Sequence, residues 1–182
     1  MTRIPRIWPL LLAALLLAGC HRAPPQDSAV PASAAATTLI LVRHAERADT
    51  SRDSPLSETG HVRARALQDA LVGSGIDLIV VSQYQRTAET AAPLATALRL
   101  RPRVEPLEGE TPIAAARLAQ RLMVEEAGRT ILIVSHSDTV PAMLNALMGS
   151  DLPELDRYGD LFILTASPSA QPRVVTARFG DD

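Results

Sequence analysis

Two histidines in this sequence follow apolar segments of the same length and similar composition. His44 ends the segment Thr38–His44 (TLILVRH), and His136 ends the segment Thr130–His136 (TILIVSH). Short, bounded runs of aliphatic residues indicate buried strands, so both histidines are expected at strand ends and at the same height in the sheet. Because ligands of open α/β sheets bind at the carboxyl ends of strands, this pair indicates a reaction centre.

Two arginines are expected beside these histidines. Arg43 directly precedes His44, and Arg86 opens an expected helix that follows a third apolar run, Leu78–Val81. The helix dipole disfavours a cation at a helix N-terminus unless an anion is bound there as well. The positions of the two guanidinium groups therefore indicate a phosphate or sulfate site next to the histidines.

The composition restricts the chemistry further. All 18 basic residues are arginine, which excludes a lysine-containing phosphate loop, a kinase lysine and Schiff-base chemistry. The one cysteine, Cys20, excludes an intrachain disulfide and any multi-cysteine zinc or iron–sulfur site. A formal net charge of −2 gives no electrostatic case for binding nucleic acid. Any anion must therefore be bound by arginine and histidine.

The elements that would position these residues alternate between strand and helix patterns. This alternation predicts an α/β fold, a three-layer αβα sandwich with a mainly parallel sheet. The expected strands are Leu39–Val42, Leu78–Val81, Ile131–Val134, Leu161–Leu164 and, at an edge, Arg173–Phe179. The expected helices are Ser57–Val72 with Ser57 as N-cap, Arg86–Leu98 with a kink or a new turn at Pro93, Ile113–Glu126 and Thr139–Met148.

The N-terminal residues are not expected to belong to this core. Residues 1–19 combine a basic start with an apolar run, Leu10–Ala18, that is too short to span a bilayer and is typical of a signal peptide. Residues 20–37 are rich in proline and alanine and are expected to form a flexible tether. The folded domain is therefore expected to comprise residues 38–182.

The end of the signal peptide, Leu-Ala-Gly-Cys, resembles the lipobox of bacterial lipoproteins. This resemblance implies cleavage before Cys20, attachment of lipid to its sulfur, and a membrane-anchored protein that faces the periplasm. His21 follows the cysteine where an aspartate would favour the inner membrane, so the outer membrane is expected. An ordinary secretory signal that happens to contain a cysteine is the alternative.

Four segments together resemble the histidine phosphatase superfamily, which includes phosphoglycerate mutase. They are Leu41–Glu46 (LVRHAE), Asp53–Gly60 (DSPLSETG), Ser82–Thr90 (SQYQRTAET) and Val134–Ser137 (VSHS), in the order that the family has. The resemblance implies a phosphoglycerate mutase-like fold and hydrolysis of phosphomonoesters without a metal or other cofactor. It implies that His44 attacks phosphorus and becomes a phosphohistidine. Arg43 and Arg86 would then hold the phosphate, and His136 would stabilise the transition state.

The group that protonates the leaving oxygen has no clear match. The family supplies a carboxyl group from the loop after its own third strand. Here the corresponding loop lies between the expected helices Arg86–Leu98 and Ile113–Glu126, and it contains Glu105, Glu108 and Glu110. Glu110, at the mouth of the next helix, is the first choice, and Glu108 is the second. Arg47 is either a third phosphate contact, as in related acid phosphatases, or an exposed loop residue. Asp138 stands where the family often has glycine, which could restrict access beside the second histidine.

Export and the absence of a long insertion over the site favour hydrolysis over mutase chemistry. The run Arg43–Arg47 (RHAER) is similar to periplasmic lipopolysaccharide core heptose phosphatases, which implies a phosphorylated small molecule or envelope component as substrate. Two other classes stay open. One is a non-catalytic envelope protein that binds phosphorylated ligands on the same scaffold. The other is a metal-dependent hydrolase that uses His44-x-Glu46 and His136-x-Asp138 as ligands.

Overall fold

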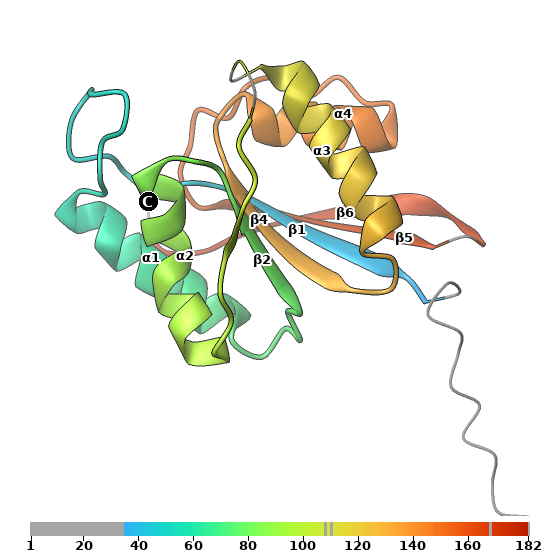
Figure 1. Cartoon of the computed structure of the whole chain (residues 1–182), viewed down its shortest axis with the longest axis horizontal. Coiled ribbons are helices and arrows are strands. Elements are labelled where there is room, and N and C mark those ends of the chain that lie inside the picture. Colours follow the sequence, from blue (N-terminus) through green and yellow to red (C-terminus); the bar gives the residue numbers. More distant parts are fainter. Residues whose placement is uncertain (1–34, 108, 110, 168, 182) are drawn as a thin grey trace, which may run out of the picture.

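In the part of the chain that the structure describes, a six-stranded sheet in the order β3-β2-β4-β1-β5-β6 forms the middle layer (Figure 1). The strands are β1 (Thr37–Arg43), β2 (Leu78–Val81), β3 (Arg103–Val104), β4 (Thr130–Ser135), β5 (Asp160–Ser167) and β6 (Ala170–Arg178). The first four strands pair in parallel, whereas β5 pairs antiparallel with β1 and with β6. This computed structural model describes residues 35–107, 109, 111–167 and 169–181. The expected signal peptide and Cys20 lie outside them.

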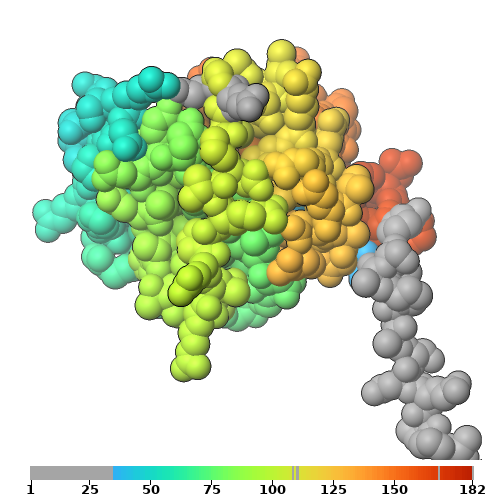
Figure 2. All heavy atoms as spheres, in the orientation of Figure 1, coloured from blue at the N-terminus to red at the C-terminus, as the bar shows by residue number. Residues whose placement is uncertain are grey.

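Helices cover both faces of the sheet. Helices α1 (Glu58–Leu71) and α2 (Gln85–Leu98) pack together on one face, and α3 (Pro112–Glu125) and α4 (Thr139–Met148) pack together on the other (Figure 1). In the space-filling view of Figure 2, the blue strand β1 is almost wholly covered by the segments in front of it. The expected α/β sandwich with a mainly parallel sheet is confirmed. No helix among the described residues is long and apolar enough to cross a bilayer.

The central strands are aliphatic throughout because both of their faces are buried. In β1, Leu39 and Leu41 pack in the cluster that includes α3 and α4. Ile40 and Val42, which alternate with them, pack in the cluster that includes α1 and α2. Strands buried on both faces cannot alternate apolar with polar residues, and this explains the unbroken runs that the sequence shows.

The observed elements differ from the expected ones in two places. Strand β3 has only two residues, and Val104 in it is exposed. The sequence therefore has no apolar run that predicts this strand. Helix α2 is continuous through Pro93 to Leu98, so the new turn that was one of the two expectations at this proline does not begin there. The neighbouring Leu94 and Ala95 are buried against the sheet. Their packing holds the helix together where the missing backbone N–H weakens it.

The two segments that resemble each other lie side by side in exact register. Strands β1 and β4 pair in parallel from Thr38 opposite Thr130 to Arg43 opposite Ser135. The next residue continues the match, because the backbone N–H of His44 donates to the carbonyl oxygen of Ser135 at 2.8 Å. Both histidines therefore leave the sheet at the same height, as the sequence predicted.

Helix α1 begins directly behind the end of β1. The Ser57 side chain caps it by accepting a hydrogen bond from the backbone N–H of Gly60 at 3.1 Å, which confirms the expected N-cap. Gly60 lies against the backbone of Glu46, whose carbonyl oxygen also accepts from the N–H of Ser57 at 2.9 Å. The first turn of α1 thus rests on the segment that carries His44. The glycine of the DSPLSETG segment permits this contact.

We expect Gly60→Ala to destabilise the fold by about 2–3 kcal/mol, because the added methyl group would overlap the carbonyl oxygen of Glu46. Urea unfolding followed by circular dichroism measures the change. Gly73→Ala is the matched control, since a methyl group there meets no atom within 4 Å, and its effect should stay within about 0.5 kcal/mol. Equal stabilities of the two variants would contradict this account of the glycine.

Candidate active site

A cavity of about 320 Å³ lies where the carboxyl ends of β1, β2 and β4 meet. Among the residues that line it are Arg43, His44, Arg47, Arg86 and His136. The structure therefore brings together the expected nucleophile, the expected second histidine and the two expected phosphate-binding arginines. Arg47, for which two roles were considered, is exposed and lines the same cavity. Parallel pairing is responsible, because it places the ends of neighbouring strands at one edge of the sheet.

His44 is buried in a defined protonation state. Its side chain is 5% exposed, and its Nδ1 lies 2.7 Å from the carbonyl oxygen of Ala45. A carbonyl oxygen can only accept, so Nδ1 carries the proton and Nε2 keeps its lone pair. Burial lowers the pKa of His44 to about 3; the hydrogen bond to Ala45 opposes this shift, and the charge of Arg86 reinforces it. The ring is therefore neutral at pH 7, which is the state that a nucleophilic imidazole requires.

His136 lies beside His44, with the two ring centroids 5.4 Å apart. Its Nδ1 is 3.4 Å from Nη2 of Arg86, and its Nε2 is 3.0 Å from the hydroxyl oxygen of Ser82. Since a guanidinium group can only donate, Nδ1 of His136 accepts and Nε2 carries the proton in this arrangement. The Nε2–H then donates to Ser82, which fixes the orientation of the ring.

Ser82 transmits this orientation into the start of α2. Its hydroxyl lies 3.1 Å from Oγ1 of Thr87, and that oxygen in turn donates to the carbonyl oxygen of Tyr84 at 2.8 Å. Ser82 and Thr87 are both buried. The serine and threonine of the SQYQRTAET segment thus hold the second histidine through a chain of buried hydrogen bonds.

Arg43 and Arg86 are both held by backbone carbonyl groups. Nη1 of Arg43 donates to the carbonyl oxygen of Leu155 at 3.0 Å, and Nη1 of Arg86 donates to that of Arg52 at 2.8 Å. Arg86 is only 8% exposed although it lies in the first turn of α2. A buried cation at the positive end of a helix is unfavourable by itself. Its position is consistent with a site that binds an anion.

The loop between β1 and α1 is fastened to the start of α2 by Asp53. The two carboxylate oxygens of Asp53 accept from the backbone N–H of Gln85 at 2.8 Å and from its side-chain amide at 3.1 Å. The backbone hydrogen bond, and then the side-chain bond, hold the pKa of Asp53 below its usual range. Tyr84, the N-cap residue of α2, makes no side-chain cap, so Asp53 supplies one from the loop. The aspartate of the DSPLSETG segment thus positions the carbonyl group that binds Arg86.

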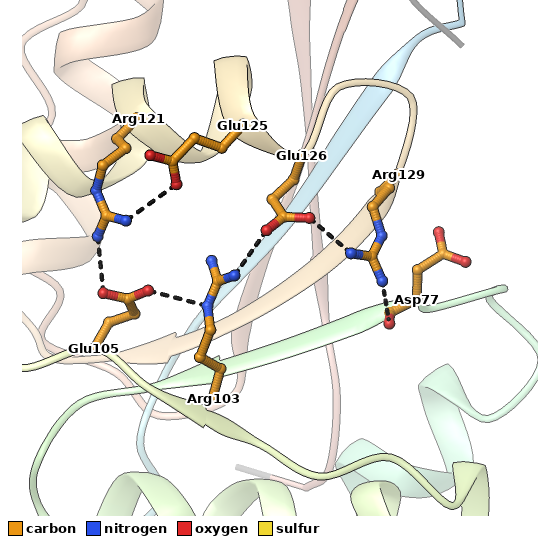
Figure 3. A network of polar contacts seen from close by, with 7 residues as sticks. All are labelled: Asp77, Arg103, Glu105, Arg121, Glu125, Glu126 and Arg129. Atoms are coloured by element: carbon orange, nitrogen blue, oxygen red, sulfur yellow. Dashed lines mark hydrogen bonds and ion pairs between the residues drawn. The ribbon is translucent and has the colours of Figure 1, made fainter.

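The structure separates the candidates for the proton donor. Both oxygens of Glu105 pair with arginines, with Nε of Arg103 at 3.0 Å and Nη2 of Arg121 at 2.8 Å (Figure 3). Glu105 lies outside the lining of the cavity that contains His44. Glu108 and Glu110 lie outside the described residues, so their selection remains a prediction. Leu107 directly precedes them and lines the cavity.

Several lining groups were not expected from the sequence. The segment between α4 and β5 forms one wall, docked by a 2.8 Å hydrogen bond from the N–H of Leu155 to the carbonyl oxygen of Ser137. Glu154 from this segment and Asp138 from the start of α4 both line the cavity. Tyr158, also from this segment, lies against Arg43. No periodic pattern marks this loop, so its place at the site was not predictable.

The metal-ligand set considered from the sequence does not assemble in the described residues. Glu46, two residues after His44, pairs through Oε1 with Arg63 at 2.7 Å and lines a different hollow. No group of three or more histidine, cysteine, aspartate or glutamate side chains in the described ranges could hold a metal ion. Glu46 instead fastens the segment after β1 to helix α1.

Comparison with known proteins supports the resemblance carried by the motifs. Residues 39–111 match the sequence model of the histidine phosphatase superfamily (branch 1). Three of the four motif segments lie within this match, and the segment that contains His136 lies beyond it. No curated protein sequence matches the chain significantly.

Solved phosphatase structures share the fold. One is a mycobacterial glucosyl-3-phosphoglycerate phosphatase (TM-score 0.66, 17% identity, covering 80% of this chain and 100% of that one). Another is the protein histidine phosphatase SixA complexed with tungstate (0.64, 21%, covering 78% and 96%). A third is a phosphoserine phosphatase from Entamoeba histolytica in complex with 3-phosphoglyceric acid (0.61, 16%, covering 80% and 98%). At these identities the likeness concerns the fold.

The lowered pKa of His44 predicts a pH-dependent stability. Below pH 6.5 the unfolded chain protonates this histidine, whereas the folded chain does not until about pH 3, so stability falls as the pH falls through this window. Between pH 7.5 and pH 5.0, the titration of His44 should lower the free energy of unfolding of the wild-type protein by about 2 kcal/mol. Urea unfolding of His44→Gln should lack that loss, since all other titrating groups are shared.

The exposed His61 on α1 offers the control for this measurement. His61→Gln is expected to keep the pH dependence of wild type. If His44→Gln and wild type lose the same stability between these two pH values, His44 is not held neutral by burial.

Proposed function

We propose that the protein hydrolyses phosphomonoesters through a phosphohistidine at His44, without a metal ion; the match of residues 39–111 to the sequence model of the histidine phosphatase superfamily supports this proposal. The observation that carries the proposal is the state of His44. Its ring is buried and neutral, and Ala45 holds the Nδ1 proton, so the lone pair of Nε2 is available for attack. Arginines of the same cavity supply the positive charge that a phosphoryl group needs.

In the proposed first step, Arg43, Arg86 and Arg47 bind the phosphate oxygens, and Nε2 of His44 attacks phosphorus in line with the leaving oxygen. The P–N bond forms while the P–O bond to the leaving group breaks, and the leaving oxygen takes a proton from an acid. His136 would donate from Nδ1, the nitrogen that does not contact Ser82, once that nitrogen carries a proton. A water molecule then attacks phosphorus, so that a new P–O bond forms while the P–N bond to His44 breaks. The water gives a proton to the deprotonated acid, which releases phosphate and restores both the acid and the neutral His44.

For the acid we propose Glu110, with Glu108 as the second choice, because both follow Leu107 and this residue lines the cavity. Glu105 is the least suited of the three, since two arginines occupy its carboxylate. Asp138 and Glu154 are further carboxyl groups of the cavity wall. A substrate with a good leaving group needs little help from any of them.

We expect His44→Ala to lower kcat/KM for an aryl phosphate by at least about 10³-fold, measured with a chelator present, because no other group forms the P–N bond. A rapid quench into alkali should trap phosphate on wild type and none on the variant. His61→Ala, which removes an exposed histidine from α1, is the control and should keep wild-type turnover.

Other outcomes separate the remaining classes. Turnover unchanged by His44→Ala would exclude the phosphohistidine mechanism. Loss of activity with chelator and its return with zinc would favour a metal-dependent hydrolase. Phosphate binding without any turnover in wild type would favour a non-catalytic protein that binds phosphorylated ligands.

We also propose that the protein is a lipoprotein anchored through Cys20 in the outer membrane. Its folded domain would face the periplasm and act on a phosphorylated envelope component. The support is the sequence: a signal-like segment ends at the one cysteine of the chain, and the RHAER run is similar to periplasmic heptose phosphatases. The fatty chains of a lipoprotein anchor would keep the domain at the membrane surface, where such substrates lie.

Expression of the full chain in a Gram-negative host tests the anchor. Radiolabelled palmitate should enter the wild-type protein, which should sediment with outer membranes. Cys20→Ser should take up no label and leave the membrane fraction, because the lipid has no sulfur to attach to. A wild-type protein that carries no label would identify the segment as an ordinary secretory signal.

A further inference from the structure

Both tyrosines of the chain lie at this site, one against Arg86 and the other against Arg43. Cζ of Arg86 is 4.1 Å from the ring centroid of Tyr84, and Cζ of Arg43 is 4.1 Å from that of Tyr158. Each ring also approaches a histidine: Tyr84 lies 5.4 Å from the ring of His136, and Tyr158 lies 6.1 Å from the ring of His44. Each tyrosine ring therefore lies against one of these two arginines and near one histidine.

A guanidinium group in this cavity must be stabilised without losing the donors that would bind phosphate. A carboxylate partner would accept from the N–H groups at the edge of the guanidinium plane, which are the same donors that a phosphate needs. An aromatic ring instead attracts the cation through its face and leaves the edge donors available. Consistent with this, Nε of Arg43 is buried and has no hydrogen-bond partner among the described residues.

We propose that Tyr84 and Tyr158 are positioning residues that hold the guanidinium groups of Arg86 and Arg43 in the orientation that binds phosphate. This inference rests on the proposed function in that it takes phosphate as the ligand of the cavity. Neither ring needs to touch the substrate. The tyrosines act through the arginines, and their contribution is orientation of the two cations before the anion arrives.

Each ring is fixed by its own part of the fold. Tyr84 is 6% exposed, its carbonyl oxygen accepts from the Thr87 hydroxyl, and its own hydroxyl accepts from Nε of Arg52 at 3.3 Å. Tyr158 is half-buried in the segment between α4 and β5. That segment docks through Leu155, whose carbonyl oxygen binds Arg43. Arg43 is thus held from two directions by one loop, through a carbonyl group and an aromatic face.

Binding of inorganic phosphate, measured by calorimetry on the folded protein, tests the proposal without requiring turnover. Tyr84→Leu and Tyr158→Leu should each raise the Kd for phosphate about tenfold, because leucine fills similar space but offers no aromatic face. Tyr84→Phe and Tyr158→Phe keep the face and should stay within about threefold of wild type. Phe179→Leu, which removes a buried aromatic ring from another core cluster, should leave phosphate affinity unchanged.

A double-mutant cycle separates positioning from packing. Tyr84→Leu should have no further effect on phosphate affinity in an Arg86→Ala background, since the cation it positions is gone. Tyr158→Leu should keep its full effect in that same background, because its partner is Arg43. In an Arg43→Ala background, Tyr158→Leu should have no further effect on phosphate affinity, whereas Tyr84→Leu should keep its full effect.

The proposal is overturned if the leucine variants bind phosphate as wild type does, or if their effects persist after removal of their own arginine. It is also overturned if the phenylalanine variants, which keep the aromatic face, fail as badly as the leucine variants. Its failure is distinguishable from that of the proposed function. If each tyrosine is coupled to its arginine in phosphate binding but the protein hydrolyses no phosphomonoester, the positioning role stands and the proposed enzymatic function fails. If the protein hydrolyses phosphomonoesters but the tyrosines and arginines are not coupled, the proposed function stands and the positioning role fails.

Discussion

The parallel pairing of β1 with β4 determines where the two histidines of the site lie. Its register places Arg43 opposite Ser135 and carries His44 to within hydrogen-bonding distance of the same backbone. A slip of one residue would turn the side chains of a strand to the other face of the sheet and separate the two histidines. Such a slip would also exchange the two packed faces of β1, because Leu39 and Leu41 pack in one cluster and Ile40 and Val42 in the other. Catalytic geometry and core packing thus depend on one strand pairing.

The protein uses arginine in two different ways. Away from the cavity, Arg103, Arg121 and Arg129 alternate with Glu105, Glu125 and Glu126 in a network that ties β3 to α3 and to the start of β4 (Figure 3). There the carboxylates occupy the guanidinium donors, and the result is structural. At the cavity, the partners of Arg43 and Arg86 include backbone carbonyl groups and the faces of tyrosines. Such partners hold a cation and leave part of its hydrogen-bonding edge for an anion.

The sequence predicted the parts of the site that follow long, buried strands. The runs that precede His44 and His136 are aliphatic because both faces of the sheet are covered. The positions at which β1 and β4 end could therefore be predicted from the sequence. The sequence did not predict the parts of the site that come from loops or from very short strands. Strand β3 is a two-residue edge strand with no apolar run. Tyr158 and Leu155 reach the site from a loop without periodicity, and their place depends on contacts with residues far apart in the sequence. Glu105, one of three similar glutamates in the sequence, is distinguished only by its two arginine partners.

The carbonyl group of Ala45 links the resting state of the site to the proposed reaction. Before attack, it fixes the proton of His44 on Nδ1 and so presents the lone pair of Nε2. After attack, the ring would carry phosphorus on Nε2 and the proton on Nδ1, and it would therefore bear a positive charge. A hydrogen bond from a charged donor is stronger than one from a neutral donor, so the same contact stabilises the intermediate more than the free enzyme. Burial keeps the ring uncharged until phosphate arrives, and the negative phosphoryl group then offsets the charge that burial opposes.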